Sequence, residues 1–523
     1  MKRRSFLAAT AAAVTGLFVK KTPVSADEAA QPSDVGAALA RFRQSIPKDF
    51  DHDYVEHALI PFFLTSVFRG EPPTLPMIDP ALSKENAFPA EFLGLVYKGW
   101  TPSREEGVTV FLQGLEYRGE NNLRKRIYMT ALTPDLYKAK YYDKVSGFFD
   151  NLLHQNFAGK PVMRNYLDYY PDIYWDLHLG VKGDEIPAHV RATGEAFNTV
   201  LALLNPMQPV VYENYMKVRA GLDPLKSWID DRVGDIESQR RPGFDKTFVH
   251  YWLKNAGDGE HFSKRDIVFE CFHNFVAISQ WGNMLYQIMS RLSEEGGNPA
   301  VRASFVKTMS GAYDDANNTP YTPLQLFVME LFRSISANAG SISSLSDTRE
   351  SIDGPSPFQS LGLPYERHSY INTPHRAANL SPVLWSNPQE FEPERFRRVP
   401  TSDQIDDAYA QKMGLAKCPF DHTKFDVADG RKASLHNSGF GAVFGVVDDK
   451  PLPVCDYAGF VPFGMGYRRC AGEQLTISVI SAFLRKVWVD KIEFTRMDLA
   501  SPGRVPIGPG SVIDDVITFR RRA

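Results

Sequence analysis

The chain has 523 residues, of which 43% are hydrophobic and 23% are charged, and its formal net charge at pH 7 is −3. This composition is ordinary for a folded globular protein, and it excludes a chain that is disordered throughout. A surface without excess positive charge does not suit a phosphate backbone, so we expect no nucleic-acid partner.

The N-terminus has the pattern of an export signal. Basic residues at positions 2–4 precede an apolar stretch from Leu7 to Val19, and Val24-Ser25-Ala26 offers a small-residue cleavage site. The paired arginines, followed by Ser-Phe-Leu, resemble a twin-arginine signal. Thirteen apolar residues are too few for an anchor, since a membrane-spanning helix needs about 20. We therefore predict a signal peptide over residues 1–26, export to the periplasm and a mature chain without a membrane anchor.

Two helical regions follow in the first half of the chain. Residues 121–129 form a basic helical segment that contains Lys125 and Arg126, and residues 166–233 are helical with proline and glycine breaks. On pattern alone, the basic segment could equally be an exposed helix face without a binding role.

A long apolar helix is predicted next, over Ile267–Trp281, with Ser263 just before its start. Three polar residues interrupt its apolar character: Glu270, His273 and Asn274. Polar groups in such a helix are either bonded core residues or parts of a site.

Two charged patterns stand in the next part of the chain. Glu330 and Arg333 lie one helical turn apart in an apolar run, and Arg395 follows in the segment Phe391–Phe396. Taken alone, the first pair would be an ordinary surface ion pair, which contributes about 0.3 kcal/mol.

The segment from about residue 400 to 460 carries two cysteines and two histidines. Cys418, His422, His436 and Cys455 could form a tetrahedral zinc site, although their spacing fits no standard zinc finger. A disulfide between the two cysteines would suit an oxidising compartment. Two unpaired thiols are the interpretation that we favour.

The most informative pattern is the loop from Phe463 to Gly472. Its glycines permit tight turns close to a flat ligand, and Cys470 stands where a helix from Glu473 onward begins. A helix N-terminus favours an ionised sulfur, which is the form that binds metal. The alternative is a buried structural cysteine in a glycine-rich turn.

This loop resembles the heme-ligand signature of the cytochrome P-450 family, Phe-Gly-x-Gly-x-Arg-x-Cys-x-Gly, at all six specified positions. The resemblance implies a mainly α fold with small β-sheets, in which residues 27–523 form a single large domain that binds heme b (iron protoporphyrin IX). By resemblance, Cys470 is the proximal iron ligand, Arg468 reaches a heme propionate and Phe463 packs beside the sulfur.

The same resemblance assigns roles upstream. Glu330, Arg333 and Arg395 would form a charge triad that holds the heme-binding core. Lys125 or Arg126 would reach the second propionate, although the usual Trp or His partner is missing. The segment of about residues 400–460 is longer than in compact members of the family and is identified as an insertion.

The helix over the heme departs from the oxygen-activating members of the family, because their Gly, acid and Thr are absent. Asn274 instead resembles the asparagine of the hydroperoxide-rearranging branch, the allene oxide synthases and hydroperoxide lyases. An amide can hydrogen-bond and orient a peroxide oxygen. The alternatives are a helix-buried amide for Asn274 and a packed core residue, rather than an acid–base group, for His273.

We therefore predict a heme-thiolate oxidoreductase that acts on a hydrophobic small molecule and uses or rearranges a fatty-acid hydroperoxide without an external reductant. One alternative is a conventional monooxygenase that uses dioxygen and electrons from an exported carrier. The other is a non-catalytic heme-binding sensor or carrier.

Overall fold

The computed structural model describes seventeen stretches of the chain: residues 32–60, 127–154, 170–203, 208–257, 262–315, 321–335, 341–345, 369–373, 375–382, 384–398, 424–426, 432–437, 443–447, 450–451, 459–464, 470–498 and 516–521. The predicted signal peptide lies outside them, and so do Lys125, Arg126, Arg468, Cys418 and Cys455. The predictions for these positions therefore stay predictions.

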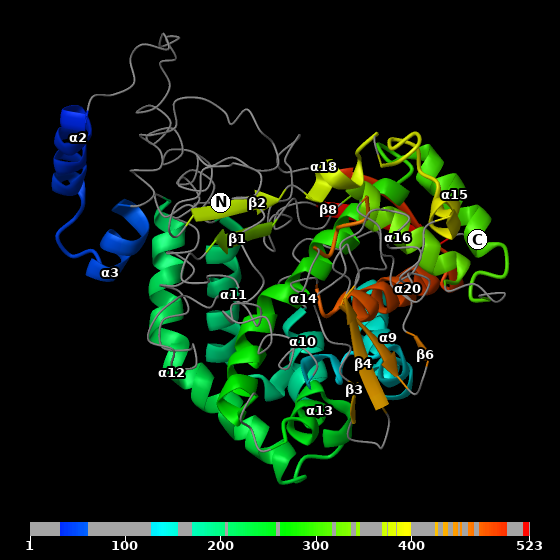
Figure 1. The fold of residues 1–523 in the computed structure, drawn as a ribbon, viewed down its shortest axis with the longest axis horizontal. Helices are drawn as coiled ribbons and strands as arrows, with labels where there is room; N and C mark the ends of the chain where they lie inside the picture. Colours follow the sequence, from blue (N-terminus) through cyan, green and yellow to red (C-terminus); the bar gives the residue numbers. More distant parts are fainter. Residues whose placement is uncertain are drawn as a thin grey trace.

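Helices make up most of the described structure (Figure 1). The α-helices are α2 (Pro32–Ser45), α3 (His52–Tyr54), α8 (Pro134–Leu136), α9 (Tyr142–His154), α10 (Tyr170–Leu179), α11 (Ala188–Leu203), α12 (Pro209–Glu237), α13 (Phe248–Asn255), α14 (Lys264–Leu292), α15 (Pro299–Met309), α16 (Pro323–Ile335), α18 (His375–Asn379) and α20 (Glu473–Val489). Short π-helical turns span Val55–Leu59 and Tyr137–Tyr141, and 3₁₀ turns span Gly183–Glu185, Phe244–Lys246 and Pro393–Arg398.

Three small antiparallel sheets accompany the helices. One pairs β1 (Ser341–Leu345) with β2 (Ser369–Thr373), and another pairs β7 (Ile492–Asp498) with β8 (Val516–Arg521). The third has the order β3 (Lys424–Asp426), β4 (Lys432–Asn437), β5 (Val443–Val447) and β6 (Lys450–Pro451). This four-stranded sheet falls within the segment of residues 400–460. The prediction of a mainly α fold with small sheets is confirmed.

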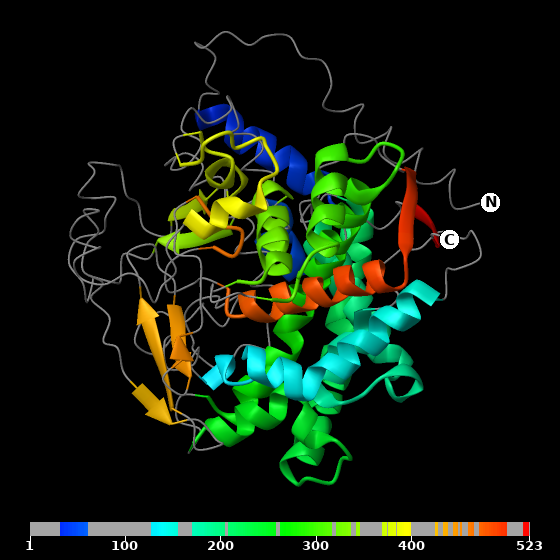
Figure 2. The ribbon, with the colours of Figure 1, turned by 90° about the vertical axis from the view of Figure 1, so that its right-hand side faces the viewer.

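Helix α14 runs through the middle of the helical body and contacts α10, α11, α12, α13, α15, α16 and α20 (Figures 1 and 2). It begins with a capping box, in which the Ser263 hydroxyl accepts from the Asp266 amide at 3.2 Å and the Asp266 carboxylate accepts from the Ser263 amide at 2.8 Å. In Figure 2, α20 lies alongside α9 and crosses the body next to α14. The helix that follows the cysteine loop is thus packed into the core.

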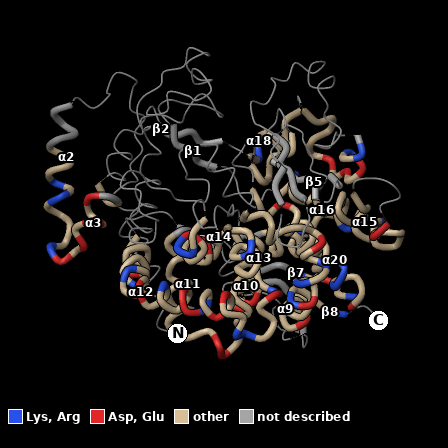
Figure 3. Tube along the Cα trace, turned by 60° about the horizontal axis from the view of Figure 1, so that its bottom comes forward, with Lys and Arg blue, Asp and Glu red and all other residues tan. Residues whose placement is uncertain are grey.

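The surface of the helical body carries both signs of charge. In Figure 3, basic and acidic residues lie close to one another along the helices. Within the part of the chain that the structure describes, no helix combines the length and the apolar character that crossing a membrane requires.

Candidate active site

The cysteine loop is held by backbone hydrogen bonds at the start of α20. The Cys470 amide donates to the Phe463 carbonyl at 2.7 Å, so the two ends of the loop are joined. Gly464 has φ = +76°, a left-handed conformation that glycine adopts without strain. The Gly472 amide lies 3.3 Å from Cys470 Sγ and donates to it. An N–H donor and a helix N-terminus both favour a thiolate, so the donor set at Cys470 fits the iron ligand of a heme.

Phe463 and Cys470 are fixed relative to the core by neighbouring elements. The Phe463 ring packs 4.8 Å from the Phe332 ring of α16, measured between centroids. The Trp281 indole of α14 donates to the Thr476 hydroxyl, in the first turns of α20, at 3.1 Å. The loop region is therefore tied to α16, which carries Glu330 and Arg333, and to α14, which carries His273 and Asn274.

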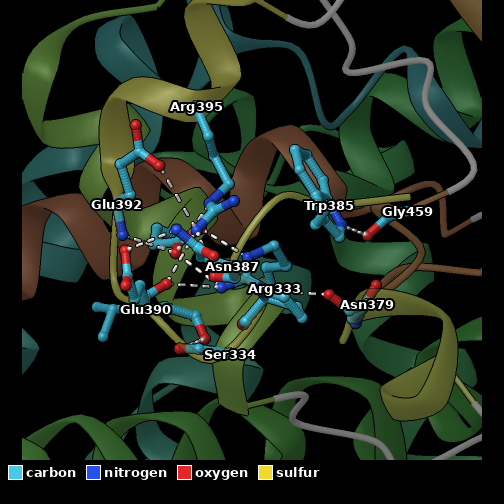
Figure 4. A network of polar contacts seen from close by, with 12 residues as sticks. Arg333, Ser334, Asn379, Trp385, Asn387, Glu390, Glu392, Arg395 and Gly459 are labelled. Atoms are coloured by element: carbon cyan, nitrogen blue, oxygen red, sulfur yellow. Dashed lines mark hydrogen bonds and ion pairs between the residues drawn. The ribbon is translucent and has the colours of Figure 1, made fainter. Parts of the chain in front are cut away.

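The structure brings Glu330, Arg333 and Arg395 together. Figure 4 shows the two arginines within one network of polar contacts. The Arg333 guanidinium donates to both carboxylate oxygens of Glu330, at 2.7 and 2.8 Å, and Arg395 Nε donates to Glu330 Oε1 at 3.2 Å. All three side chains are at most 3% exposed. Spacing alone had suggested a surface ion pair for Glu330 and Arg333, and that interpretation is wrong.

The remaining donors of the two arginines are used by backbone carbonyls. Arg333 donates to the carbonyl oxygens of Asn379 and Pro388, both at 2.9 Å, and Arg395 donates to those of Ser386 and Glu390 at 3.1 and 2.9 Å. The charges are therefore buried with their hydrogen bonds made, as a stable buried ion cluster requires. These acceptors come from the last residue of α18 and from the segment between α18 and the 3₁₀ turn Pro393–Arg398.

Two residues to which the sequence assigned no role join this cluster to the cysteine loop. The Asn379 side-chain oxygen accepts from the Val461 amide at 2.8 Å. The Trp385 indole donates to the Gly459 carbonyl at 2.7 Å, and its ring lies 5.7 and 5.3 Å from the guanidinium carbons of Arg333 and Arg395. Gly459 and Val461, just before the cysteine loop, are thus held by the same part of the chain that supplies the acceptors to the triad.

Glu270, His273 and Asn274 lie on one face of α14, since residues three and four apart share a helix face. His273 Nδ1 lies 3.2 Å from Glu270 Oε2. Glu270 is fully buried, His273 is 6% exposed and Asn274 is 4% exposed. Among the described residues, Asn274 Nδ2 has no hydrogen-bond partner. The Asn274 amide lies beside the Tyr128 phenol, so that phenol is the group that a polar ligand of this amide would displace.

The opposite side of α14 is aromatic and packed. The Phe272 ring lies 4.5 Å from the Phe197 ring of α11, and the Phe275 ring lies 4.6 and 4.8 Å from the rings of Tyr170 and Tyr174 of α10. Helices α10 and α11 therefore cover this side. The polar face with Asn274 points away from them.

Tyr128 connects the polar face of α14 with the cysteine loop. Burial raises the pKa of the Tyr128 phenol well above its usual range, and the negative charges of Glu270 and of a Cys470 thiolate raise it further. A side-chain hydrogen bond with Asn274 partly opposes this rise of the pKa. One phenol thus lies within electrostatic reach of both Glu270 and Cys470. No motif in the sequence indicated this residue.

Comparison with protein-family models gives no match, and comparison with curated proteins gives none either. Solved structures do match. The retinoic-acid-bound cyanobacterial CYP120A1 is similar over 81% of this chain and 85% of its own, with 14% identity and a TM-score of 0.50. The cytochrome P450 CYP102L1 is similar over 84% of each chain, with 13% identity and a TM-score of 0.50.

Proposed function

Because this chain has the cytochrome P-450 fold, we propose that it is a heme-thiolate oxidoreductase that binds heme b through Cys470. Its substrate is a hydrophobic organic hydroperoxide, such as that of a fatty acid, and it needs no external reductant. The observation that carries the proposal is the pairing of two features around Tyr128. The first is Cys470, whose sulfur accepts a hydrogen bond at the start of α20, where a thiolate is favoured. The second is the buried amide of Asn274 on α14.

The protein's own groups have distinct tasks in this proposal. The Gly472 amide stabilises negative charge on Cys470 Sγ, so the sulfur binds as a thiolate. A bound heme would supply the chemistry that cleaves an O–O bond, which a thiolate ligand favours. Asn274 Nδ2 donates to a peroxide oxygen and orients it. Aromatic packing around Phe272 and Phe275 fills the opposite side of α14, which faces α10 and α11.

Two features of α14 favour peroxide over dioxygen as the oxidant: the missing proton-delivery residues and the buried Asn274 amide. Dioxygen requires two electrons and two protons before its O–O bond breaks, whereas a hydroperoxide arrives already reduced. The Gly, acid and Thr of the oxygen-activating pattern are absent from the sequence around Asn274. An amide cannot relay protons as a carboxyl and a hydroxyl do, but it can hold a peroxide. The predicted export of the chain, away from reduced nicotinamide, also supports this choice.

The test is the anaerobic reaction of the heme-loaded mature protein with a fatty-acid hydroperoxide, without reductant, in which peroxide loss and products are followed. We expect rapid loss with wild type and a drop of about 10²-fold or more for Asn274→Ala, comparable to removing one preorganised donor. Peroxide that survives beside an intact, thiolate-bound heme would instead favour a monooxygenase with an exported electron carrier, or a non-catalytic heme protein.

A pair of cysteine variants provides the control for the ligand. Cys470→Ala should abolish the thiolate signature in the optical spectrum of the carbon-monoxide complex. Cys271→Ala should keep it, because Cys271 is buried in α14 and burial raises the pKa of its thiol well above the usual value. Loss of the signature in both variants would indicate general disruption of the heme site, and its persistence in Cys470→Ala would exclude this cysteine as the ligand.

A further inference from the structure

Glu270 and His273 form a buried pair of titratable groups beside Asn274 that the proposed function does not yet use. His273 Nδ1 lies 3.2 Å from Glu270 Oε2, and the two side chains are 7% and 0% exposed. The His273 ring lies parallel to the Phe269 ring at 5.9 Å, which limits its rotation. Burying a carboxylate next to an imidazole is costly unless the pair is bonded, so the arrangement is more than a chance surface contact.

The carboxylate sets the tautomer of the histidine. A carboxylate only accepts hydrogen bonds, so Nδ1 carries the proton that is donated to Glu270. In the neutral ring, Nε2 is then the unprotonated nitrogen and can accept a proton. Glu270 therefore keeps His273 in the form that a general base needs.

The pair lies on the same face of α14 as Asn274, because residues three and four apart share a helix face. Glu270 and Asn274 are one helical turn apart, and both shift the pKa of the Tyr128 phenol. The charge of a Cys470 thiolate shifts the same pKa. Tyr174 and Cys271 likewise sense the negative charge of Glu270, and burial raises the pKa of each of them well above its usual range. These neighbours stay neutral, so they do not compete with His273 for the proton.

We propose that His273 is the catalytic base and acid of peroxide cleavage and that Glu270 is the positioning residue that orients it. This inference rests on the proposed function. The hydroperoxide O–H bond breaks and its proton moves to His273 Nε2. The O–O bond then breaks, and the leaving oxygen takes both electrons of that bond and the same proton, departing as an alcohol. The hydroperoxide would thereby be reduced by two electrons, which a bound heme would supply while taking up the other oxygen atom. Return of that oxygen atom to the same substrate molecule would restore the heme, so no external reductant enters the balance.

The proposal can be tested with a ligand that must lose a proton to bind. Hydrogen cyanide binds ferric heme as the anion, so a base next to the iron speeds its association. We expect His273→Gln to slow cyanide association by about 10²-fold, the lower range for general base catalysis, and Glu270→Gln to slow it less. Glu270→Gln should also change the pH profile of the association rate. Imidazole, which loses no proton on binding, should associate with both variants at the wild-type rate.

Cys271→Ala serves as the matched control, because Cys271 adjoins Glu270 but lies towards α10, where its carbonyl accepts from the Tyr174 hydroxyl. It should bind cyanide like wild type. The proposal is overturned if both pair variants bind cyanide at the wild-type rate. It is also overturned if the association rates of cyanide and imidazole fall equally in the variants, because that would indicate restricted access of both ligands to the heme.

Hydroperoxide turnover by the same proteins separates this inference from the proposed function. If wild type consumes the hydroperoxide and His273→Gln loses about 10²-fold in rate, both are supported. If wild type leaves the hydroperoxide intact, the proposed function fails, and the cyanide measurement alone decides whether His273 is a base.

Discussion

At the scale of single residues, Glu330 illustrates how this protein makes a buried charge tolerable. Its carboxylate is fully buried and accepts from two guanidinium groups and from the Glu392 amide, at 2.9 Å in the last case. Each arginine in turn finds backbone carbonyls for its other donors. Such a cluster holds its geometry because removing any one member leaves the others desolvated and uncompensated.

Glu330→Gln should therefore destabilise the protein strongly. The amide cannot balance the two buried guanidinium charges of Arg333 and Arg395, so we expect the free energy of unfolding to fall by about 3–5 kcal/mol. Urea denaturation measures this. Glu394→Gln is the control, since Glu394 pairs with Arg397 at the same i, i+3 spacing but its side chain is 58% exposed. That change should stay within about 0.5 kcal/mol. Equal losses in both variants would contradict the argument.

At the scale of elements, α11 and α14 approach closely because a glycine faces an aromatic ring. A Cβ placed on Gly194 of α11 would lie 2.4 Å from the Phe275 ring of α14, which is shorter than any normal contact. The ring cannot move aside easily, because it packs against Tyr170, Tyr174 and Trp175 of α10. Since Phe275 follows Asn274 in the chain, this contact also sets the rotation of α14 about its axis.

Gly194→Ala should consequently cost about 1–3 kcal/mol of stability, the usual range for overpacking a core. Hydrogen exchange should show faster opening of α11 and α14, and chemical denaturation gives the free energy. Gly147→Ala in α9 is the matched control, because a Cβ there meets nothing within 4 Å and alanine favours helix over glycine by up to about 1 kcal/mol. If Gly194→Ala proved as stable as wild type, the close approach of the two helices would be wrong.

At the scale of the whole molecule, local patterns predicted the elements and missed how they meet. The start of α14 after Ser263 was predicted from its capping residue. The predicted end at Trp281 is wrong, because the helix continues to Leu292, where Met284, Leu285 and Ile288 are buried in the core. Those contacts come from distant elements, and the Gly-Asn pair after Trp281 carries no sign of them.

The candidate site divides in the same way. The residues Cys470 and Phe463 could be predicted because a short loop motif carries them together. Tyr128 and Trp385 could not, because each is a single aromatic residue whose partners lie far away in the chain. The family resemblance implied the triad of Glu330, Arg333 and Arg395, but spacing alone did not show the burial of Glu330, since the acceptors that surround the triad come from a separate segment. Sequence spacing reports contacts within an element, and these contacts join different ones.

The stability of the whole molecule should depend on pH through two buried histidines. Burial lowers the pKa of His178 from 6.5 to about 3 and that of His375 from 6.5 to about 4. His178 Nδ1 donates to the Tyr174 carbonyl at 2.9 Å, while its Nε2 has no hydrogen-bond partner among the described residues, so the folded protein holds the ring neutral. Below about pH 6.5 the unfolded chain binds protons that the folded protein does not bind.

The free energy of unfolding should therefore fall as the pH is lowered from about 6.5 towards 4, by up to about 1.4 kcal/mol per pH unit for each histidine. Urea denaturation at a series of pH values measures this slope. His178→Phe keeps a ring against Tyr174 but cannot titrate, so its slope should be shallower by about one proton. A slope in His178→Phe that equals that of wild type would mean that His178 already carries its proton in the folded protein.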